Sequence, residues 1–209
     1  MATEDSNEAN SGRIPVDFFT ANGMTPLMFC AQLGDVQGVQ ALLKSGAQVD
    51  KISEDGRHTS LTLAALNNRV EAARVLACTG VGSNIAPPNS RRTALMIAAD
   101  AGYVDVIEAL AACELDYESE DGETALHVAC KAGQVGAVHK ILELGADVNY
   151  ESKRGENVTA LMCAMKANAM NIIEELVRQN AHVNYENSQG ETRSFMQLMV
   201  PVPQTSLTQ

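Results

Sequence analysis

Apolar residues recur along this chain at helical spacing, in short runs separated by glycine and asparagine turns. The stretch 121–149 shows the pattern most completely. It opens with an Asp-Gly turn, after which Thr124 is placed to cap a first helix over 125–132. A glycine ends that helix, because glycine tolerates the left-handed conformation found there. A second helix is predicted to follow, with an apolar face formed by Val135, Val138, Ile141 and Leu142.

This unit is repeated along the chain. The residues equivalent to the capping threonine are Thr25, Thr59, Thr93, Thr124, Thr159 and Thr192, so that successive spacings are 34, 34, 31, 35 and 33. The second residue after each threonine is a leucine except in the last copy, which has Ser194: Leu27, Leu61, Leu95, Leu126 and Leu161. A fixed period of this length, shared by so many copies, indicates a repeat architecture.

A period near 33 residues, with one turn and two helices in each unit, resembles the ankyrin repeat, whose consensus is T-P-L-H-x-A. The closest matches are Thr25-Pro26-Leu27 with Ala31, and Thr124-Ala125-Leu126-His127 with Ala129. The resemblance extends over about 21–200. It implies an all-α solenoid of helix-turn-helix repeats joined by β-hairpin-like turns, in which the core is continuous between neighbouring units.

The repeats define the expected domain organisation. Five are predicted, at about 22–50, 55–84, 89–116, 121–149 and 155–184, with a partial sixth at 190–200, so that an ankyrin-like domain occupies 13–200. Residues 1–12 are polar and are predicted to be a disordered acidic tail, and 201–209 a flexible one. The apolar segment 14–19 is expected to cover the open end of the first repeat. The partial sixth repeat either caps the other end or belongs to a longer solenoid.

Two junctions depart from the common pattern. In the second repeat Asn68 replaces the usual glycine before the second helix, and asparagine also adopts the left-handed conformation. Before the third repeat, Asn89-Ser90 replaces the Asp-Gly turn. Pro87 and Pro88 cannot donate backbone hydrogen bonds there, so a weak or distorted hairpin is predicted.

Composition narrows the classes of partner. The formal net charge is −11, which disfavours nucleic acid and anionic membrane surfaces and is compatible with a basic protein or peptide. The five cysteines contain no C-x-x-C pair and are expected to be small core residues in a reducing compartment. No apolar run is long enough to span a membrane, and the N-terminus resembles neither a secretory nor a mitochondrial signal. We therefore predict a protein of the cytoplasm and also of the nucleus. When it is not bound to a partner, we expect it to be a monomer.

The turns before the fourth, fifth and sixth repeats carry aligned tyrosines and glutamates. One column contains Tyr117, Tyr150 and Tyr185, a second Glu118, Glu151 and Glu186, and a third Glu123, Glu156 and Glu191; Glu120, Asp121 and Arg154 lie among them. Ankyrin-type proteins bind partners on the concave side, so this strip is predicted to grip an extended basic segment. The alternative is that each tyrosine braces its own hairpin and that the carboxylates form a solvated rim.

Four basic residues belong to the same predicted surface. Arg91 and Arg92 would make the middle of the groove basic and could meet an acidic partner segment, or they could be ordinary solvated loop charges. Lys131 and Lys166 end successive first helices, one repeat apart, and could pair with the nearby turn glutamates.

The sequence offers little for an enzyme. His127 occupies the histidine position of the consensus, where a hydrogen bond from its ring to a neighbouring turn is expected. No spacing of cysteine and histidine fits a metal site or a catalytic pair, and no glycine-rich phosphate loop is present, so no cofactor is predicted.

The function predicted from the sequence is therefore a non-catalytic interaction module or adaptor that binds a protein or peptide on its concave surface. One alternative is a regulatory subunit that masks a partner enzyme or a localisation signal. Another is a targeting fragment of a larger multidomain enzyme.

Overall fold

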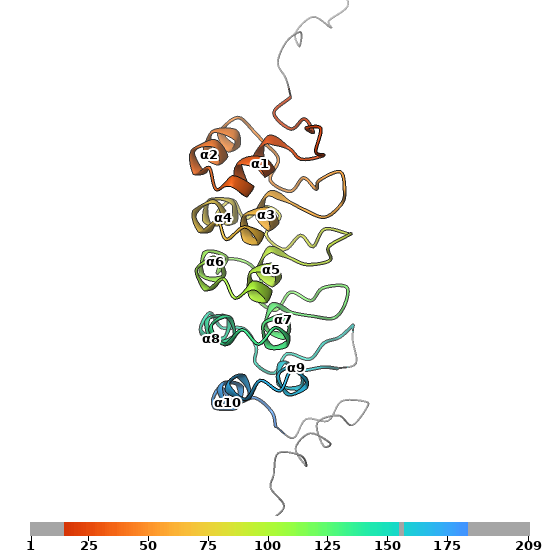
Figure 1. The fold of residues 1–209 in the computed structure, drawn as a ribbon, viewed down its shortest axis with the longest axis vertical. Helices are drawn as coiled ribbons and strands as arrows, with labels where there is room; N and C mark the ends of the chain where they lie inside the picture. The colour runs from red at the N-terminus through yellow and green to blue at the C-terminus, as the bar shows by residue number, and fades with distance from the viewer. Residues whose placement is uncertain (1–14, 155–156, 184–209) are drawn as a thin grey trace, which may run out of the picture.

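The structure, a computed structural model, describes residues 15–154 and 157–183, and within them the chain forms helices and no strands. The helices pair in chain order into layers that stack along one axis (Figure 1). The first helices of the pairs are α1 (Pro26–Leu33), α3 (Ser60–Leu66), α5 (Ala94–Ala101), α7 (Ala125–Lys131) and α9 (Ala160–Lys166). The second helices are α2 (Val36–Lys44), α4 (Val70–Ala77), α6 (Val104–Ala109), α8 (Val135–Glu143) and α10 (Met170–Arg178). The predicted all-α solenoid is confirmed.

The repeated threonine starts every first helix. Each of Thr25, Thr59, Thr93, Thr124 and Thr159 is extended, and its hydroxyl accepts a hydrogen bond from the backbone N–H three residues later. In α1, α3 and α7 the side chain at that third position accepts from the threonine's own N–H, which completes a capping box. These bonds satisfy backbone donors that a helix N-terminus otherwise leaves without partners.

The first helices end in a left-handed residue, which turns the chain back into the second helix. Gly34 and Gly102 fill this position after α1 and α5 with φ of 80° and 72°. Asn68 does so after α3 with φ of 54°, which confirms the prediction for that asparagine. Asn168 has the same role after α9, with φ of 52°.

The core lies between the two helices of each layer and continues from one layer to the next. Each first helix packs on the next, α1 on α3, α3 on α5, α5 on α7 and α7 on α9, and the second helices pack behind them in the same order. The leucine column is buried throughout: Leu27, Leu61, Leu95, Leu126 and Leu161. Val135 is a correction to the predicted core, because it is 44% exposed. It is the first residue of α8, and the inward face of that helix begins at Ala137 and Val138.

The turns project from one side of the stack, opposite the second helices (Figure 1). Each is a short hairpin closed by backbone bonds, as between Ser119 N and Glu123 O at 2.9 Å. Neighbouring hairpins are joined as well, since Asn89 N donates to Gly56 O at 2.9 Å. The proline-containing turn is irregular, as predicted: Pro87 O accepts from both Ser90 N and Arg91 N.

The N-terminal cover differs from the expected one. Val16 packs against the core, but Phe18 and Phe19 are 42% and 37% exposed. The segment is held largely by polar contacts, because Asp17 accepts from Gln48 N and its carbonyl from Lys51 Nζ. Cys78 also corrects the expectation for the cysteines, since it is exposed beyond the end of α4. The predicted tails and partial sixth repeat lie outside the described residues.

Candidate functional site: the concave surface between the third and fifth repeats

The surface that the sequence predicts to be concave is formed by the hairpin turns and the exposed sides of the first helices. The sequence alignment places the same positions of each repeat along it, so the candidate residues fall into rows one layer apart. Most of those that the structure describes lie between the turn before α7 and the end of α9. Glu156, Tyr185 and Glu186 of the predicted strip lie outside the described residues, as does Glu191.

Glu118 joins two successive turns. Its Oε2 accepts from the Tyr150 hydroxyl at 3.1 Å, and its Oε1 accepts from the Ser152 hydroxyl at 3.2 Å and from Arg154 N at 2.7 Å. All three donors belong to the next turn along the chain. The carboxylate therefore connects the hairpin before α7 to the hairpin before α9.

This network changes the acidity of Glu118. Burial alone would raise the pKa of the carboxyl, but the backbone donors of Arg154 and Lys153 and the hydroxyls of Tyr150 and Ser152 stabilise the anion. The pKa of Glu118 is consequently below its ordinary value, and the group is ionised at neutral pH.

The two described tyrosines of the column are built into the fold. Tyr117 is half-buried against the core. Tyr150 donates to Glu118, and its ring lies edge-on to that of His127, with centroids 6.3 Å apart. Lys153 Nζ lies 5.8 Å from the centre of the Tyr150 ring. These contacts give Tyr150 a bracing role, whatever else its exposed edge contacts.

The carboxylates at the turn tips meet the basic residues that were expected to form a separate part of the groove. Arg91 lies 3.6 Å from Glu120 and 3.2 Å from Asp121, across one repeat. Arg92 pairs with Asp100 of α5 at 2.8 Å. All of these side chains are largely exposed, so the pairs contribute little to stability. Glu151 is exposed at the next turn, beside a shallow hollow that Lys153 also lines.

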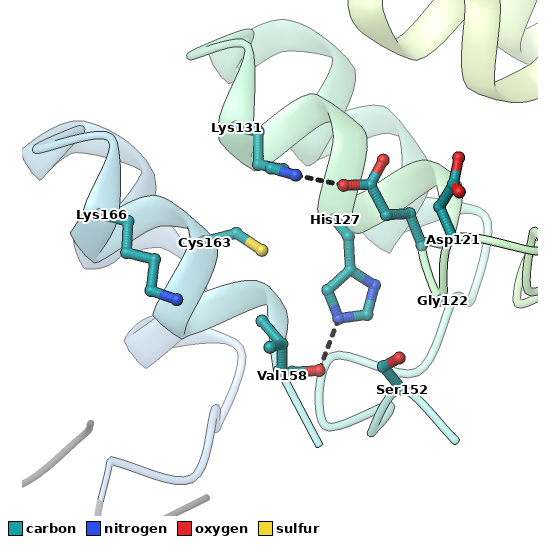
Figure 2. A pocket seen from close by; sticks show the side chains of 9 residues that line it. Asp121, Gly122, His127, Lys131, Ser152, Val158, Cys163 and Lys166 are labelled. Carbon is teal, nitrogen blue, oxygen red and sulfur yellow. Dashed lines mark hydrogen bonds and ion pairs between the residues drawn. The ribbon is translucent and has the colours of Figure 1, made fainter. Parts of the chain in front are cut away.

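A cavity of about 250 Å³ opens between α7 and α9 (Figure 2). Its walls come from the turn before α7, from the two helices and from the turn before α9. The lining residues are Asp121, Gly122, Glu123, His127, Lys131, Ser152, Val158, Cys163 and Lys166. At its edge Lys131 forms an ion pair with Glu123, the pairing of turn glutamate and lysine that the sequence suggested. The Glu123 carboxylate raises the pKa of Lys131.

His127 holds one wall of this cavity in place. Its Nε2 lies 3.0 Å from Val158 O of the next repeat (Figure 2). Its Nδ1 lies 3.3 Å from Thr124 N. Because a carbonyl can only accept, Nε2 carries the proton and Nδ1 accepts, which is the neutral ring. Burial lowers the pKa of His127 against the effect of the Val158 carbonyl. The predicted structural bond to a neighbouring turn is present.

The predicted site did not include five residues of the cavity wall: Gly122 and His127, which were given structural roles, and Ser152, Val158 and Cys163. The alignment of the repeats could have indicated such positions. Cys163 of α9, for example, lies four residues after its capping threonine and is equivalent to Val128 of α7. What the register could not show is that space remains between the two helices. That depends on the side chains that meet there.

Across 15–154 and 157–183, no group of three or more histidine, cysteine or acidic side chains is arranged to hold a metal ion. None of the helices in these ranges has the length and apolar character needed to cross a membrane.

Comparison with known proteins agrees with the geometry. A family model described as ankyrin repeats in three copies matches residues 6–89 and 80–152, and one described as a single ankyrin repeat matches 156–188. The chain belongs to the ankyrin repeat family. Ankyrin repeats generally mediate protein–protein interaction and are typically non-catalytic.

Two relatives show the same repeats within much longer proteins. Neurogenic locus notch homolog protein 1 of Xenopus tropicalis is 28% identical over 172 residues, which cover 74% of this chain and 7% of that protein. Ankyrin repeat and KH domain-containing protein mask-1 of Caenorhabditis elegans is 30% identical over 129 residues, which cover 60% of this chain and 5% of that protein. The chain thus spans less than a tenth of either relative.

Proposed function

We propose that this ankyrin repeat chain is a non-catalytic adaptor that binds a protein partner along its concave surface, between the turn before α7 and the end of α9. The observation that carries the proposal is the cavity between α7 and α9, set in a surface of exposed charged side chains. The stacked layers hold the surface in one shape, so little conformational entropy is lost when a partner binds.

The surface has two kinds of acidic side chain. Glu118 and Glu123 are committed to bonds within the chain, whereas Glu120, Asp121 and Glu151 are exposed at the turn tips. We assign contact with a basic part of the partner to the exposed group. The Arg91 pairs with Glu120 and Asp121 are weak enough to exchange for pairs with a partner.

The test is affinity capture from a eukaryotic extract with identification by mass spectrometry. Three baits are compared: the wild type, Glu120→Lys/Glu151→Lys, and a control with the same charge change, Glu108→Lys/Glu174→Lys. The control residues are exposed on the second helices α6 and α10. A protein captured by the wild type and the control but lost from the turn variant supports the proposal. A protein retained by all three baits would place binding elsewhere and contradict it.

A further inference from the structure

The α7–α9 cavity has the size and the walls of a receptor for one side chain. Its volume of about 250 Å³ is smaller than the pockets that enclose drug-sized ligands. Val158 and Cys163 supply apolar wall, while charged groups stand around it. A side chain with a short apolar stem and a polar end matches this arrangement.

The charges at the cavity are distinctive within the repeat series. Lys131 and Lys166 occupy the seventh position after their threonines, and the same position holds Gln32, Leu66 and Asp100 in the three preceding repeats. Among the described repeats, α7 and α9 are therefore the only neighbouring first helices that both have a basic residue at this position. The earlier acidic member, Asp100, is paired with Arg92.

Lys131 retains the capacity to bind a second anion. An ammonium group has three N–H donors, and the Glu123 contact occupies one of them. The lysine side chain is 57% exposed, so a further acceptor can approach it from the groove. Glu123 is 22% exposed and stays paired, so an incoming acceptor shares the lysine with it.

We propose that this cavity receives an aspartate or glutamate side chain from an extended segment of the protein partner, with the carboxylate held between Lys131 and Lys166. The proposal rests on the proposed function and names the chemistry of the residue that enters the groove. Asp121 and Glu123 also line the cavity, and each is already paired with a basic side chain, Arg91 or Lys131. A basic side chain placed between Lys131 and Lys166 would meet two like charges. The groove is therefore expected to read an acidic residue at the cavity and basic residues at the turn tips.

The test uses random dodecapeptides displayed on phage and selected on the full chain. Four proteins are compared: wild type, Lys131→Glu/Lys166→Glu, the neutral Lys131→Gln/Lys166→Gln, and the control Lys44→Glu/Lys140→Glu on the second helices. Circular dichroism shows whether each protein is folded. If the charge-reversed variant does not fold, the neutral variant is used in its place to test the loss of the acidic preference. Peptides selected on wild type and control should share an aspartate or glutamate at one aligned position. Selection on the reversed pair should replace it with lysine or arginine.

Affinity then measures the contribution of the cavity. The peptide consensus selected on the wild type should bind the Lys131→Gln/Lys166→Gln variant about tenfold or more weakly than it binds the wild type. A peptide whose acidic residue is replaced by glutamine should bind the wild-type protein more weakly by a similar factor. Peptides that bind without an acidic position, or whose affinity ignores both lysines, would overturn the cavity proposal and leave the binding function standing. A library that yields no binder on any of the four proteins would count against both.

Discussion

At the scale of single residues, the turns of this protein are held by side chains that look like recognition groups in the sequence. Glu118 belongs to a column of carboxylates, yet both of its carboxylate oxygens accept hydrogen bonds from the next turn of the chain. Tyr150 belongs to a column of aromatic residues, yet its hydroxyl is directed at Glu118. A residue in such a column can therefore connect repeats as well as contact a partner.

Replacement of Glu118 by glutamine should destabilise the fold, because the amide has one acceptor oxygen instead of two and presents N–H groups to a backbone donor. We expect a loss of about 1 kcal/mol in the free energy of unfolding, below the range of about 1.5–3 kcal/mol for bonds to charged groups, because Glu118 is only half-buried. Urea denaturation at neutral pH measures it. Glu151→Gln, at the equivalent exposed position, is the control and should change little. Equal effects of the two variants would remove the assigned role.

The stability of the chain should fall as the solution is acidified through the histidine range. The pKa of His127 is lower in the folded state than its ordinary value of 6.5, so the unfolded state binds the proton first. Its contribution is fully present above about pH 6.5 and declines as the pH falls toward the folded-state pKa. The melting temperature, measured between about pH 7.5 and pH 5.5, should decrease in the wild type.

The His127→Gln variant isolates this effect. Glutamine can accept the Thr124 N–H in a capping box but has no proton to gain in this range. Its melting temperature should be lower than that of the wild type at neutral pH and should depend less on pH over the same interval. A variant with the wild-type pH dependence would assign the decline to other groups.

For Glu118, whose folded-state pKa is also depressed, the corresponding loss comes only below the ordinary carboxylate range.

At the scale of elements, the first helices are short and depend on their caps and on the layers beside them. Helices of seven or eight residues, such as α7 and α5, are too short to be stable alone in water. The threonine caps fix where they begin, and a left-handed residue fixes where they end. Burial of the leucine column between layers supplies the main stabilisation.

The leucine column gives a direct test of this packing. Leu126→Ala should lower the free energy of unfolding by about 2–5 kcal/mol, because its side chain is fully buried and the neighbours close only partly around the gap. Leu66→Ala is the matched control in another first helix, where the leucine is 48% exposed. It should change stability by about 0.5 kcal/mol or less. Chemical denaturation measures both, and similar losses would mean that the inward face has been misassigned.

At the scale of the whole molecule, contacts join neighbouring layers, and each interior layer is supported on two sides. Helix α5 packs on its own partner α6 and on the layers at both sides, through α3 and α7. Helix α1 packs on its own partner α2 and on one neighbouring layer, through α3. Stability in such a stack is close to a sum of nearest-neighbour terms. The described end layers therefore have fewer stabilising neighbours than the middle ones.

Amide hydrogen exchange should reveal this gradient. Peptides from α5, α6, α7 and α8 should exchange most slowly, and those from α1 and α2 faster, since local opening at an end breaks one interface instead of two. Mass spectrometry of the exchanged protein gives the comparison. Equal protection along all the described helices would indicate that the stack opens as a single cooperative unit.

The sequence by itself determined the period, the helix pairs and the inward leucines, because each depends on local rules: a capping threonine, a left-handed glycine or asparagine, and helical spacing of apolar residues. It also indicated the histidine that bonds to a neighbouring turn. The tertiary structure decided which polar side chains are already engaged, because Arg91, Glu118 and Lys131 find partners whose distances no register can state. It also decided that a cavity exists between α7 and α9, since space between layers depends on how their side chains meet.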